Sequence, residues 1–340
     1  MLAAVYYSNK DIRIQEFPKP KINDNEILLK VISSGICGSD VLEWYRIKQA
    51  PRVLGHEAAG DIVEAGKNVK NYKVGDRIFV SHHVPCNTCD YCLKGHHTAC
   101  HTLHTTNFDP GGFAEFIRIP EINVDRGILK LPESVDYDEG TFIEPLGCVI
   151  RGQRIANIKA GDSVLVIGSG ISGLLHIQLA KISGASKIFA ADISYYRLNA
   201  AKKFGADFTI DAKNSIAEEL KKSNNGKLAD VVILCTGAIE AVNQAAQCVE
   251  KGGAILFFAV PKPGIDVTIP ITDFWRNEIK ILTSYGAAPA DLKTSLDLIS
   301  SKKINVKIMI THKLPLTEAQ KGFQLVAEAK ESIKVILEPN

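Results

Sequence analysis

Four closely spaced cysteines constrain this chain more than any other feature. Their spacing, C-x2-C-x2-C-x7-C, lets one loop wrap four thiolates tetrahedrally around a single zinc ion. The four residues are Cys86, Cys89, Cys92 and Cys100. Four thiolates leave no open coordination position, so a metal held there is structural. The spacing therefore predicts a structural zinc lobe over about residues 82–104 and places any chemistry elsewhere.

The bulk composition narrows the class of protein. With 340 residues, 46% hydrophobic and 23% charged, the chain is long enough for two domains with separate cores. Its 40 basic and 38 acidic side chains leave a net charge of +2, too small to indicate a nucleic-acid or membrane-surface partner. There is no signal sequence, and no apolar run is long enough to span a membrane. These features predict a cytoplasmic protein that acts on a small molecule.

The pattern of apolar residues changes along the chain. Up to about Pro132, short β-type runs separated by glycine and proline indicate an irregular antiparallel barrel. From Asp162 to about Tyr285, apolar strands alternate with helical stretches, which is typical of βαβ units on a parallel sheet. The last part reads helix, strand, helix, strand and is expected to pack on the first domain. The prediction is an α/β protein with one domain at residues 1–146 and 286–340 and a second at residues 147–285.

A glycine motif in the second domain predicts a dinucleotide site. Gly168, Gly170 and Gly173 follow an apolar strand and open a helical pattern, which suits a tight turn that approaches a pyrophosphate. The motif also contains Ile171 and Ser172. The alternative is a glycine turn that binds no ligand.

An acidic residue after the next strand indicates which dinucleotide is preferred. Asp192 lies about 20 residues beyond the glycines, where a carboxylate accepts hydrogen bonds from the ribose of NAD and repels the 2′-phosphate of NADP. NAD is therefore the preferred cofactor. Arg197, just beyond, could tolerate NADP.

A second set of metal-ligand residue types is scattered through the first domain. Cys37, the pair His56 and Glu57, and Glu144 supply sulfur, nitrogen and oxygen ligands. Such a mixed set could converge on one zinc ion that keeps a position for substrate. The alternative is a buried thiol, a core histidine and two surface charges.

Motifs spread over essentially the full length carry a family resemblance. They are GICGSD, LGHEAAG, VGDRIFV, the four-cysteine lobe, PGGFAEF, IEPLGC, VLVIGSGISGL, CTG and KGGAILF. In order and spacing the chain resembles the zinc-dependent medium-chain dehydrogenase/reductase family, and within it the sorbitol (polyol) dehydrogenase branch. The resemblance implies a GroES-like irregular barrel, a doubly wound Rossmann domain inserted before its last part, and an active site in the cleft between them.

The resemblance also implies a role for each residue of the second metal set. Cys37 and His56 match the family's catalytic zinc ligands, and Glu144 matches the carboxylate that replaces a second cysteine in polyol dehydrogenases. Glu57 matches the acidic neighbour that binds the metal directly or through water. The implied content is two zinc ions per subunit, one catalytic and one structural.

The same resemblance assigns the residues that handle protons and cofactor. Asp40 matches the carboxylate that orients the ligating histidine, and Ser39 matches the hydroxyl that receives the proton of the substrate alcohol. Thr236, in the CTG motif, is expected to contact the cofactor. A homodimer or homotetramer built through the edge of the Rossmann sheet is also implied, and Ala254–Val260 is a long apolar strand that an edge could not leave uncovered.

The chain departs from the polyol-dehydrogenase pattern near the expected substrate. Leu42 replaces the usual relay histidine, Glu43 replaces an aromatic residue, and Trp44 is retained. Ser284 stands where an arginine would precede Tyr285. These changes disfavour threonine and sorbitol itself. One hypothesis is that Glu43 faces the substrate and favours a cationic or hydroxyl-rich ligand; the alternative is a solvated helix charge.

The prediction is an enzyme that uses zinc and NAD to oxidise a secondary alcohol of a polyol, inositol or amino-sugar substrate to a ketone. An alternative is a general zinc alcohol dehydrogenase or ketone-aldehyde reductase acting on simple compounds. A third interpretation is a non-catalytic dinucleotide-binding protein. Among the histidines near the cysteine lobe, most are expected to be exposed, with one of His82 or His83 lining the cleft as an alternative.

Overall fold

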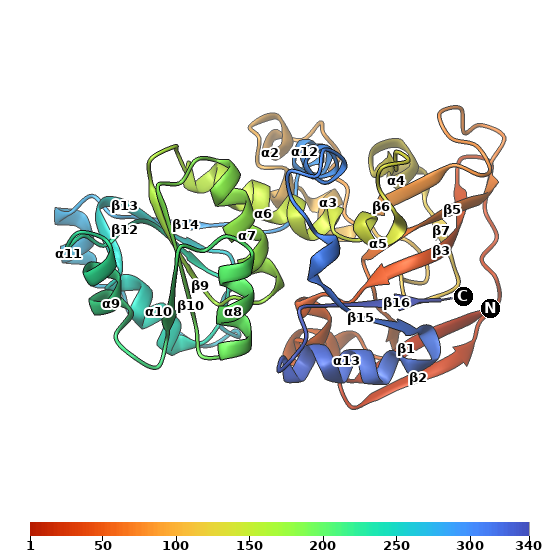
Figure 1. The fold of residues 1–340 in the computed structure, drawn as a ribbon. Coiled ribbons are helices and arrows are strands. Elements are labelled where there is room, and N and C mark those ends of the chain that lie inside the picture. The colour runs from red at the N-terminus through yellow and green to blue at the C-terminus, as the bar shows by residue number, and fades with distance from the viewer. Residues whose placement is uncertain (340) are drawn as a thin grey trace. The chain divides into compact units, whose positions relative to one another are not determined.

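The chain forms two compact units in a computed structural model that describes residues 1–339 (Figure 1). Unit 1 consists of Met1–Gly147 together with the chain from Ala287 onward, and unit 2 is Cys148–Gly286. Among the residues that the structure describes, no helix combines the length and apolar composition that crossing a membrane requires.

Unit 2 is built on a six-stranded sheet in which every neighbouring pair of strands is parallel. The order is β11-β10-β9-β12-β13-β14, which is 3-2-1-4-5-6 when counted from β9, the order of a doubly wound dinucleotide fold. The strands are β9 (Ser163–Ile167), β10 (Lys187–Asp192), β11 (Phe208–Asp211), β12 (Ala229–Leu234), β13 (Val249–Phe257) and β14 (Lys280–Thr283). The parallel sheet that the alternation of strands and helices predicted is confirmed.

Helices follow the strands of unit 2 and pack against the sheet (Figure 1). All five residues of β9 are buried, as expected for a strand covered on both faces. The helices are α7 (Ile171–Ile182), α8 (Tyr195–Lys203), α9 (Ile216–Ser223), α10 (Ile239–Ala246) and α11 (Ile271–Arg276). The order of strands reverses between β9 and β12, so the carboxyl end of β9 is where such a sheet binds a ligand.

One position of the sheet differs from the expectation. Ala254–Val260 was expected to be an edge strand that a second copy of the chain would cover, but β13 lies between β12 and β14. The edge is β14, where Ile281 remains 38% exposed. The prediction took the longer apolar run of β13 for the edge strand, because β14 is short and carries a lysine.

Unit 2 buries a histidine in the middle of α7. His176 is fully buried, packs edge-on against Phe258 with ring centroids 4.6 Å apart, and has Gln153 Nε2 at 3.2 Å from its Nδ1. Burial lowers the pKa of His176 from 6.5 to about 3, because the interior disfavours the imidazolium. The ring is therefore neutral throughout the neutral pH range.

This burial predicts a loss of stability in acid. Below pH 6.5 the unfolded chain protonates His176 while the folded chain does not, so the free energy of unfolding falls with pH, by about 3 kcal/mol at pH 4. His176→Leu is expected to remove this part of the pH dependence. Urea unfolding at several pH values between about 7 and 4 would measure this loss of stability, because His176 of the unfolded chain titrates over that range. Equal pH slopes for both proteins would contradict the assignment.

Unit 1 contains one sheet of seven strands and one of three. The larger has the order β15-β16-β3-β5-β6-β8 with β7 paired to β3, and the smaller has the order β2-β1-β4. Their strands are β1 (Leu2–Ser8), β2 (Asp11–Glu16), β3 (Ile27–Gly35), β4 (Arg52–Val53), β5 (Glu57–Ala65), β6 (Arg77–Ser81), β7 (Phe116–Ile119), β8 (Ile128–Lys130), β15 (Ile310–Pro315) and β16 (Lys334–Glu338). Register shifts in β3 at Leu28/Leu29 and Val31/Ser33 make the larger sheet irregular.

The last part of the chain completes the sheet of unit 1. β16 pairs antiparallel with β3 and parallel with β15, so residues after unit 2 lie beside the N-terminal strands (Figure 1). The helices along the N-terminal part are α1 (Glu43–Arg46), α2 (Asp90–Leu93), α3 (His101–Thr105), α4 (Glu121–Arg126), α5 (Tyr137–Gly140) and α6 (Ile143–Ala156). Those after unit 2 are α12 (Pro289–Ser300) and α13 (Ala319–Glu328). Single 3-10 turns are η1 (Gly38–Val41), η2 (Ile47–Gln49), η3 (His97–Ala99), η4 (Lys307–Met309) and η5 (Leu316–Glu318).

Candidate metal centres and nucleotide-binding turn

The four cysteines of the lobe come together in unit 1. Their sulfur atoms all lie within 4.8 Å of one another, and none of the four is in a disulfide. Cys89 and Cys92 are 3.6 Å apart between sulfurs, as are Cys86 and Cys100. Short helices α2 and η3 turn the loop back on itself, so the spacing in sequence becomes one compact cluster.

The acidities of these thiols indicate how the cluster would hold a cation. Hydrogen bonds from the amides of Thr88 and Cys89 lower the pKa of Cys86 to about 5. Burial and the neighbouring sulfurs raise the pKa of Cys92 to about 12. Several thiolates this close repel one another unless a cation lies among them, and four sulfur donors suit zinc. The donor set therefore fits a structural zinc ion.

A second cluster brings a cysteine at the start of η1 together with two consecutive residues at the start of β5. Ligand atoms of Cys37, His56 and Glu57 all lie within 4.8 Å of one another. Cys37 caps η1, while His56 directly precedes β5 and Glu57 begins it. The sulfur of Cys37 accepts from the amide and from the hydroxyl of Ser39, each at 3.4 Å. One sulfur, one nitrogen and one carboxylate oxygen form a mixed set that could hold zinc.

Asp40 contacts two residues of this cluster, Cys37 and His56. It is fully buried; its Oδ2 accepts from the amide of Cys37 at 3.1 Å, and its Oδ1 lies 3.4 Å from Nδ1 of His56. Burial alone would raise the pKa of Asp40, but the charges of His56 and Arg46 and the amide of Cys37 hold that pKa below its usual value. A histidine whose Nδ1 faces a carboxylate presents its other nitrogen to a metal.

Arg46 bonds to both Ser39 and Asp40, a role that was not predicted from the sequence. Its Nε donates to the carbonyl of Ser39 at 3.0 Å, and its Nη2 lies 3.2 Å from both Ser39 Oγ and Asp40 Oδ1. A lone arginine on a polar helix resembles an ordinary surface charge, and only the geometry of η1 and α1 brings it onto Ser39.

Glu57 is part of a buried ion pair that the sequence did not indicate. Its carboxylate bonds to the ammonium of Lys334 on β16, and both side chains are almost completely buried. Burial raises the pKa of Glu57, with Lys334 and His56 opposing and the carboxylate of Glu144 reinforcing the rise. Glu144, in the first turn of α6, is therefore close enough to act on Glu57 electrostatically.

Two histidines of the lobe lie beside this second cluster. The rings of His56 and His82 have centroids 4.8 Å apart, and those of His82 and His83 are 3.8 Å apart. Burial and the nearby positive groups lower the pKa of His83 to about 4. Nδ1 of His82 is buried and has no hydrogen-bond partner among the described residues. His82 thus lies beside His56 and His83 lies beside His82, and both rings are neutral near neutral pH.

The residues expected near the substrate are either partly exposed or in contact with neighbouring side chains and backbone. Oε1 of Glu43 accepts from the amide of Asn9 at 3.2 Å, so this carboxylate is held by the turn between β1 and β2. Trp44 stacks obliquely beside Tyr45, with ring centroids 5.8 Å apart, and Leu42 is 42% exposed. Tyr285 belongs to unit 2 and is 51% exposed. The contact with Asn9 favours the alternative in which Glu43 is a solvated structural charge.

The glycine motif of unit 2 forms the turn that was predicted. Gly168 has φ +95°, and a Cβ there would lie 3.1 Å from the backbone of Cys235 and 3.3 Å from Cβ of Thr236. At Gly173 a Cβ would collide with the carbonyl of Gly168, so helix and strand approach closely only with glycine there. Gly170 is the N-cap of α7, whose first residues are Ile171 and Ser172.

Asp192 lies at the end of β10 beside this turn. Its Oδ2 accepts from the amide of Ser169 at 2.7 Å and its Oδ1 from the amide of Ser194 at 2.9 Å. Arg197 Nη1 is 3.9 Å from the same carboxylate. A Cβ built on Gly170 would lie 3.9 Å from the guanidinium carbon of Arg197. Both charges therefore border the turn, in the arrangement that a ribose or a 2′-phosphate would meet.

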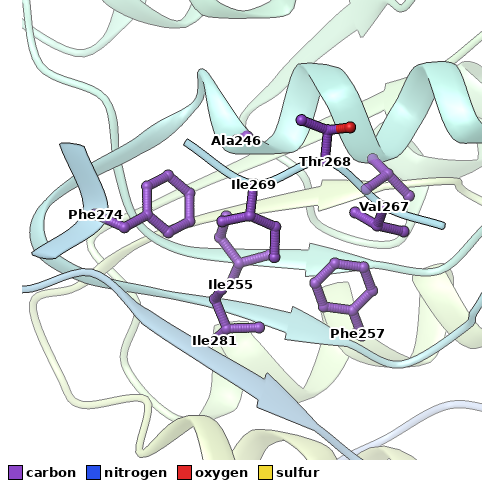
Figure 2. A pocket seen from close by; sticks show the side chains of 9 residues that line it. Ala246, Ile255, Phe257, Val267, Thr268, Ile269, Phe274 and Ile281 are labelled. Atoms are coloured by element: carbon purple, nitrogen blue, oxygen red, sulfur yellow. The ribbon is translucent and has the colours of Figure 1, made fainter. Parts of the chain in front are cut away.

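Unit 2 also has an apolar hollow, which Figure 2 shows at close range. Apart from Thr268, its lining is entirely apolar and includes Phe257, Ile269, Phe274 and Ile281. A binding site needs convergent polar groups to orient a ligand. The lining of this hollow has no metal-ligating or titratable side chain, so the hollow itself offers no group for catalysis.

Two family models match the chain. The model described as "Alcohol dehydrogenase GroES-like domain" matches residues 23–133, and the model described as "Zinc-binding dehydrogenase" matches residues 172–301. The two matches lie mainly in unit 1 and in unit 2 respectively.

Individual relatives match over nearly their whole length. Sorbitol dehydrogenase of Gallus gallus is 33% identical, over 99% of this chain and 96% of the relative. A probable D-xylulose reductase A of Aspergillus clavatus is 34% identical, over 96% of this chain and 93% of the relative. Among solved structures, a putative zinc-binding dehydrogenase of Sinorhizobium meliloti bound to NADP is 28% identical, with a TM-score of 0.88 and 99% of each chain covered. The fold class predicted from the sequence is confirmed. The chain belongs to the zinc-dependent medium-chain dehydrogenase/reductase family, in its sorbitol dehydrogenase-like branch.

Proposed function

We propose that this protein is a zinc-dependent polyol dehydrogenase that oxidises a secondary alcohol to a ketone with NAD. The observation that carries the proposal is the convergence of Cys37, His56 and Glu57 beside the hydroxyl of Ser39. Named relatives that act on sorbitol and xylulose support a polyol as substrate. The alternative, a general alcohol dehydrogenase for simple alcohols, is favoured by Leu42 and Ser284, which replace residues expected in the polyol branch.

In the proposed site, Cys37 and His56 would hold the catalytic zinc, with Glu144 as a further ligand and Glu57 as the adjacent carboxylate. Zinc bound there supplies a Lewis acid that makes a substrate hydroxyl more acidic. Asp40 holds His56 in the tautomer that leaves its other nitrogen free for a ligand role. The four cysteines of the lobe would hold the second, structural zinc ion.

In this reaction Ser39 would receive the proton of the substrate, and the cofactor would receive the hydride. The substrate hydroxyl passes its proton to Ser39 Oγ as the hydroxyl proton of Ser39 leaves to water. When bound, NAD would supply the acceptor for the hydride that leaves the C–H bond of the carbinol carbon, so the net products would be a ketone, NADH and a proton. Unit 2 would bind the cofactor through Gly168–Gly173, Asp192 and Thr236.

A substrate panel tests this function. We expect NADH formation with vicinal polyols such as inositols, xylitol and amino-polyols, measured with zinc-loaded protein. Turnover confined to simple secondary alcohols would support the alternative, and turnover of neither class would indicate the non-catalytic interpretation.

Cofactor choice can be tested at Asp192. Asp192→Asn keeps an acceptor oxygen for only one of the two amides, that of Ser169 or that of Ser194, and removes the charge that would repel a 2′-phosphate. The ratio of kcat/KM for NADP to that for NAD should rise about tenfold or more, since removing a close like charge relieves at least about 1.4 kcal/mol. Asp211→Asn, at the paired position on the neighbouring strand β11, is the matched control. An unchanged ratio for Asp192→Asn would exclude the proposed role.

We also propose that the protein is a cytoplasmic homodimer or homotetramer. Eight free cysteines, four of them in one cluster, suit a reducing compartment. The exposed edge strand β14, with Ile281 38% exposed and Trp275 of α11 76% exposed nearby in sequence, suits pairing with a second copy. Light scattering should give two or four times the mass of one chain, and Ile281→Lys should lower it. A wild-type mass of one chain would contradict this assembly.

A further inference from the structure

The guanidinium of Arg46 donates hydrogen bonds to two residues of the candidate catalytic site, Ser39 and Asp40. Arg46 ends the single-turn helix α1, and 13% of its side chain is exposed. Three of its hydrogen bonds reach the carbonyl and hydroxyl oxygens of Ser39 and the carboxylate of Asp40, between 3.0 and 3.2 Å. The guanidinium also lies over the ring of Tyr45, 4.7 Å from its centroid, which holds it from the other side.

Asp40 links Arg46 to the candidate metal-ligating residues Cys37 and His56. The two oxygens of this buried carboxylate face the amide of Cys37, the Nδ1 of His56 and the Nη2 of Arg46. A carboxylate that faces a histidine ligand raises the basicity of that ligand. A permanent positive charge on the same carboxylate weakens this effect, and so keeps the metal centre more electron-poor.

We propose that Arg46 is a positioning residue of the oxidation, which fixes Ser39 Oγ and offsets the charge of Asp40 where the relay histidine is replaced by Leu42. The inference rests on the proposed function. A guanidinium stays protonated in proteins and accepts no proton. Arg46 therefore does not relay the proton of Ser39; it occupies one lone pair of the hydroxyl, so that Oγ has a defined direction toward its remaining partners.

A second arginine provides a matched control. Arg52, on β4, also acts electrostatically on His82 and His83, but its hydrogen bond goes to Gln49, at 2.8 Å. Arg52 forms no hydrogen bond or ion pair with Ser39 or Asp40, all three of which lie in the described part of the chain. A general effect of positive charge near the site would appear in both Arg46 and Arg52 variants, whereas positioning of Ser39 and Asp40 would appear only in the former.

The test compares Arg46→Gln, Arg46→Lys and Arg52→Gln by two measurements. The first is steady-state oxidation of the best polyol. Arg46→Gln should lower kcat about 10- to 100-fold, the order of effect of losing one preorganised donor, with KM changed by less than about threefold. Arg46→Lys, which keeps the charge, should recover part of the loss, and Arg52→Gln should match the wild type.

The second measurement does not depend on turnover. A chelator competes with the metal-free protein for Co2+, and the visible spectrum distinguishes the mixed-ligand cluster from the four-thiolate lobe. Removal of a nearby positive charge should leave Co2+ bound at least as tightly in Arg46→Gln as in the wild type. Weaker Co2+ binding would show that Arg46 only supports the loop of Cys37, and a kcat within twofold of the wild type would equally overturn the proposal. If the wild type oxidised no alcohol, the proposed function would fail, while the Co2+ competition would still decide the electrostatic role of Arg46.

Discussion

Replacement of Lys334 by methionine should destabilise unit 1 by about 3–5 kcal/mol, the usual cost of removing one partner from a buried ion pair. Lys334 is 0% exposed and its ammonium bonds to Glu57, which is 1% exposed. Without the lysine, Glu57 would be a buried carboxylate with its main compensating charge removed. Methionine fills most of the same space, so the loss reports the charge rather than a cavity.

Thermal and urea unfolding measure this effect. For a unit of this size the expected decrease in Tm is about 10 °C. The matched control is Lys321→Met, which removes an exposed lysine paired with Glu318 and should cost less than about 1 kcal/mol. The double variant Glu57→Gln with Lys334→Met should recover much of the loss, because no charge is then left unpaired. A loss below about 1 kcal/mol for Lys334→Met would contradict the buried pair.

Gly35 explains why this pair fits where it does. Gly35 lies opposite Glu57 in the β3–β5 pairing, and a Cβ at Gly35 would collide with the carboxylate of Glu57 and the ammonium of Lys334. The absence of a side chain leaves the space that both groups occupy. The ion pair thus links β5 to β16, the strand that returns after unit 2, directly beside the candidate catalytic cluster.

Replacement of Cys37 by alanine should lower kcat/KM at least about 1,000-fold, because zinc supplies several kcal/mol of charge stabilisation to such a reaction. Cys37 is the only sulfur donor of the three-residue cluster among the described residues. Loss of that donor should remove one zinc ion per chain and leave the four-cysteine lobe loaded. Steady-state kinetics and metal analysis on the same preparation measure both quantities.

Two further variants make this prediction specific. Cys89→Ala, in the lobe, should release the structural zinc ion and lower Tm, because metal binding there stabilises the local fold. Cys248→Ala removes a buried thiol of unit 2 outside both clusters and should keep both metals and the activity. Full activity in Cys37→Ala would exclude this cluster as the catalytic centre.

Local patterns predicted much of the fold and the lobe. The four cysteines lie in one short loop, so their spacing alone was enough to indicate a cluster. The glycine turn and Asp192 were likewise recognisable because strand, turn, helix and strand follow one another directly. Ligand type alone made Cys37, His56 and Glu57 a candidate set, but their roles came from the family resemblance, since no periodicity connects η1 to the start of β5.

Contacts between distant elements could not be predicted in this way. Lys334 and Glu57 are 277 residues apart, and in sequence Lys334 is one more lysine of a lysine-rich C-terminal part. For Glu43 the sequence left two hypotheses open, because its partner Asn9 lies 34 residues away, in a turn whose position depends on the pairing of β1 with β2. Arg46 is close to Ser39 in sequence, yet its direction depends on how η1 leads into α1.

The central claim is tested most directly by the rate of NADH formation from NAD and a polyol before metal removal, after it, and after return of zinc. Both metal clusters should fill, giving about two zinc ions per chain. The account predicts that the metal-free protein is inactive, that zinc restores the rate, and that Cys37→Ala stays inactive with the lobe loaded. Undiminished oxidation by folded, metal-free protein, or no alcohol oxidation by the protein with both clusters filled, would contradict it.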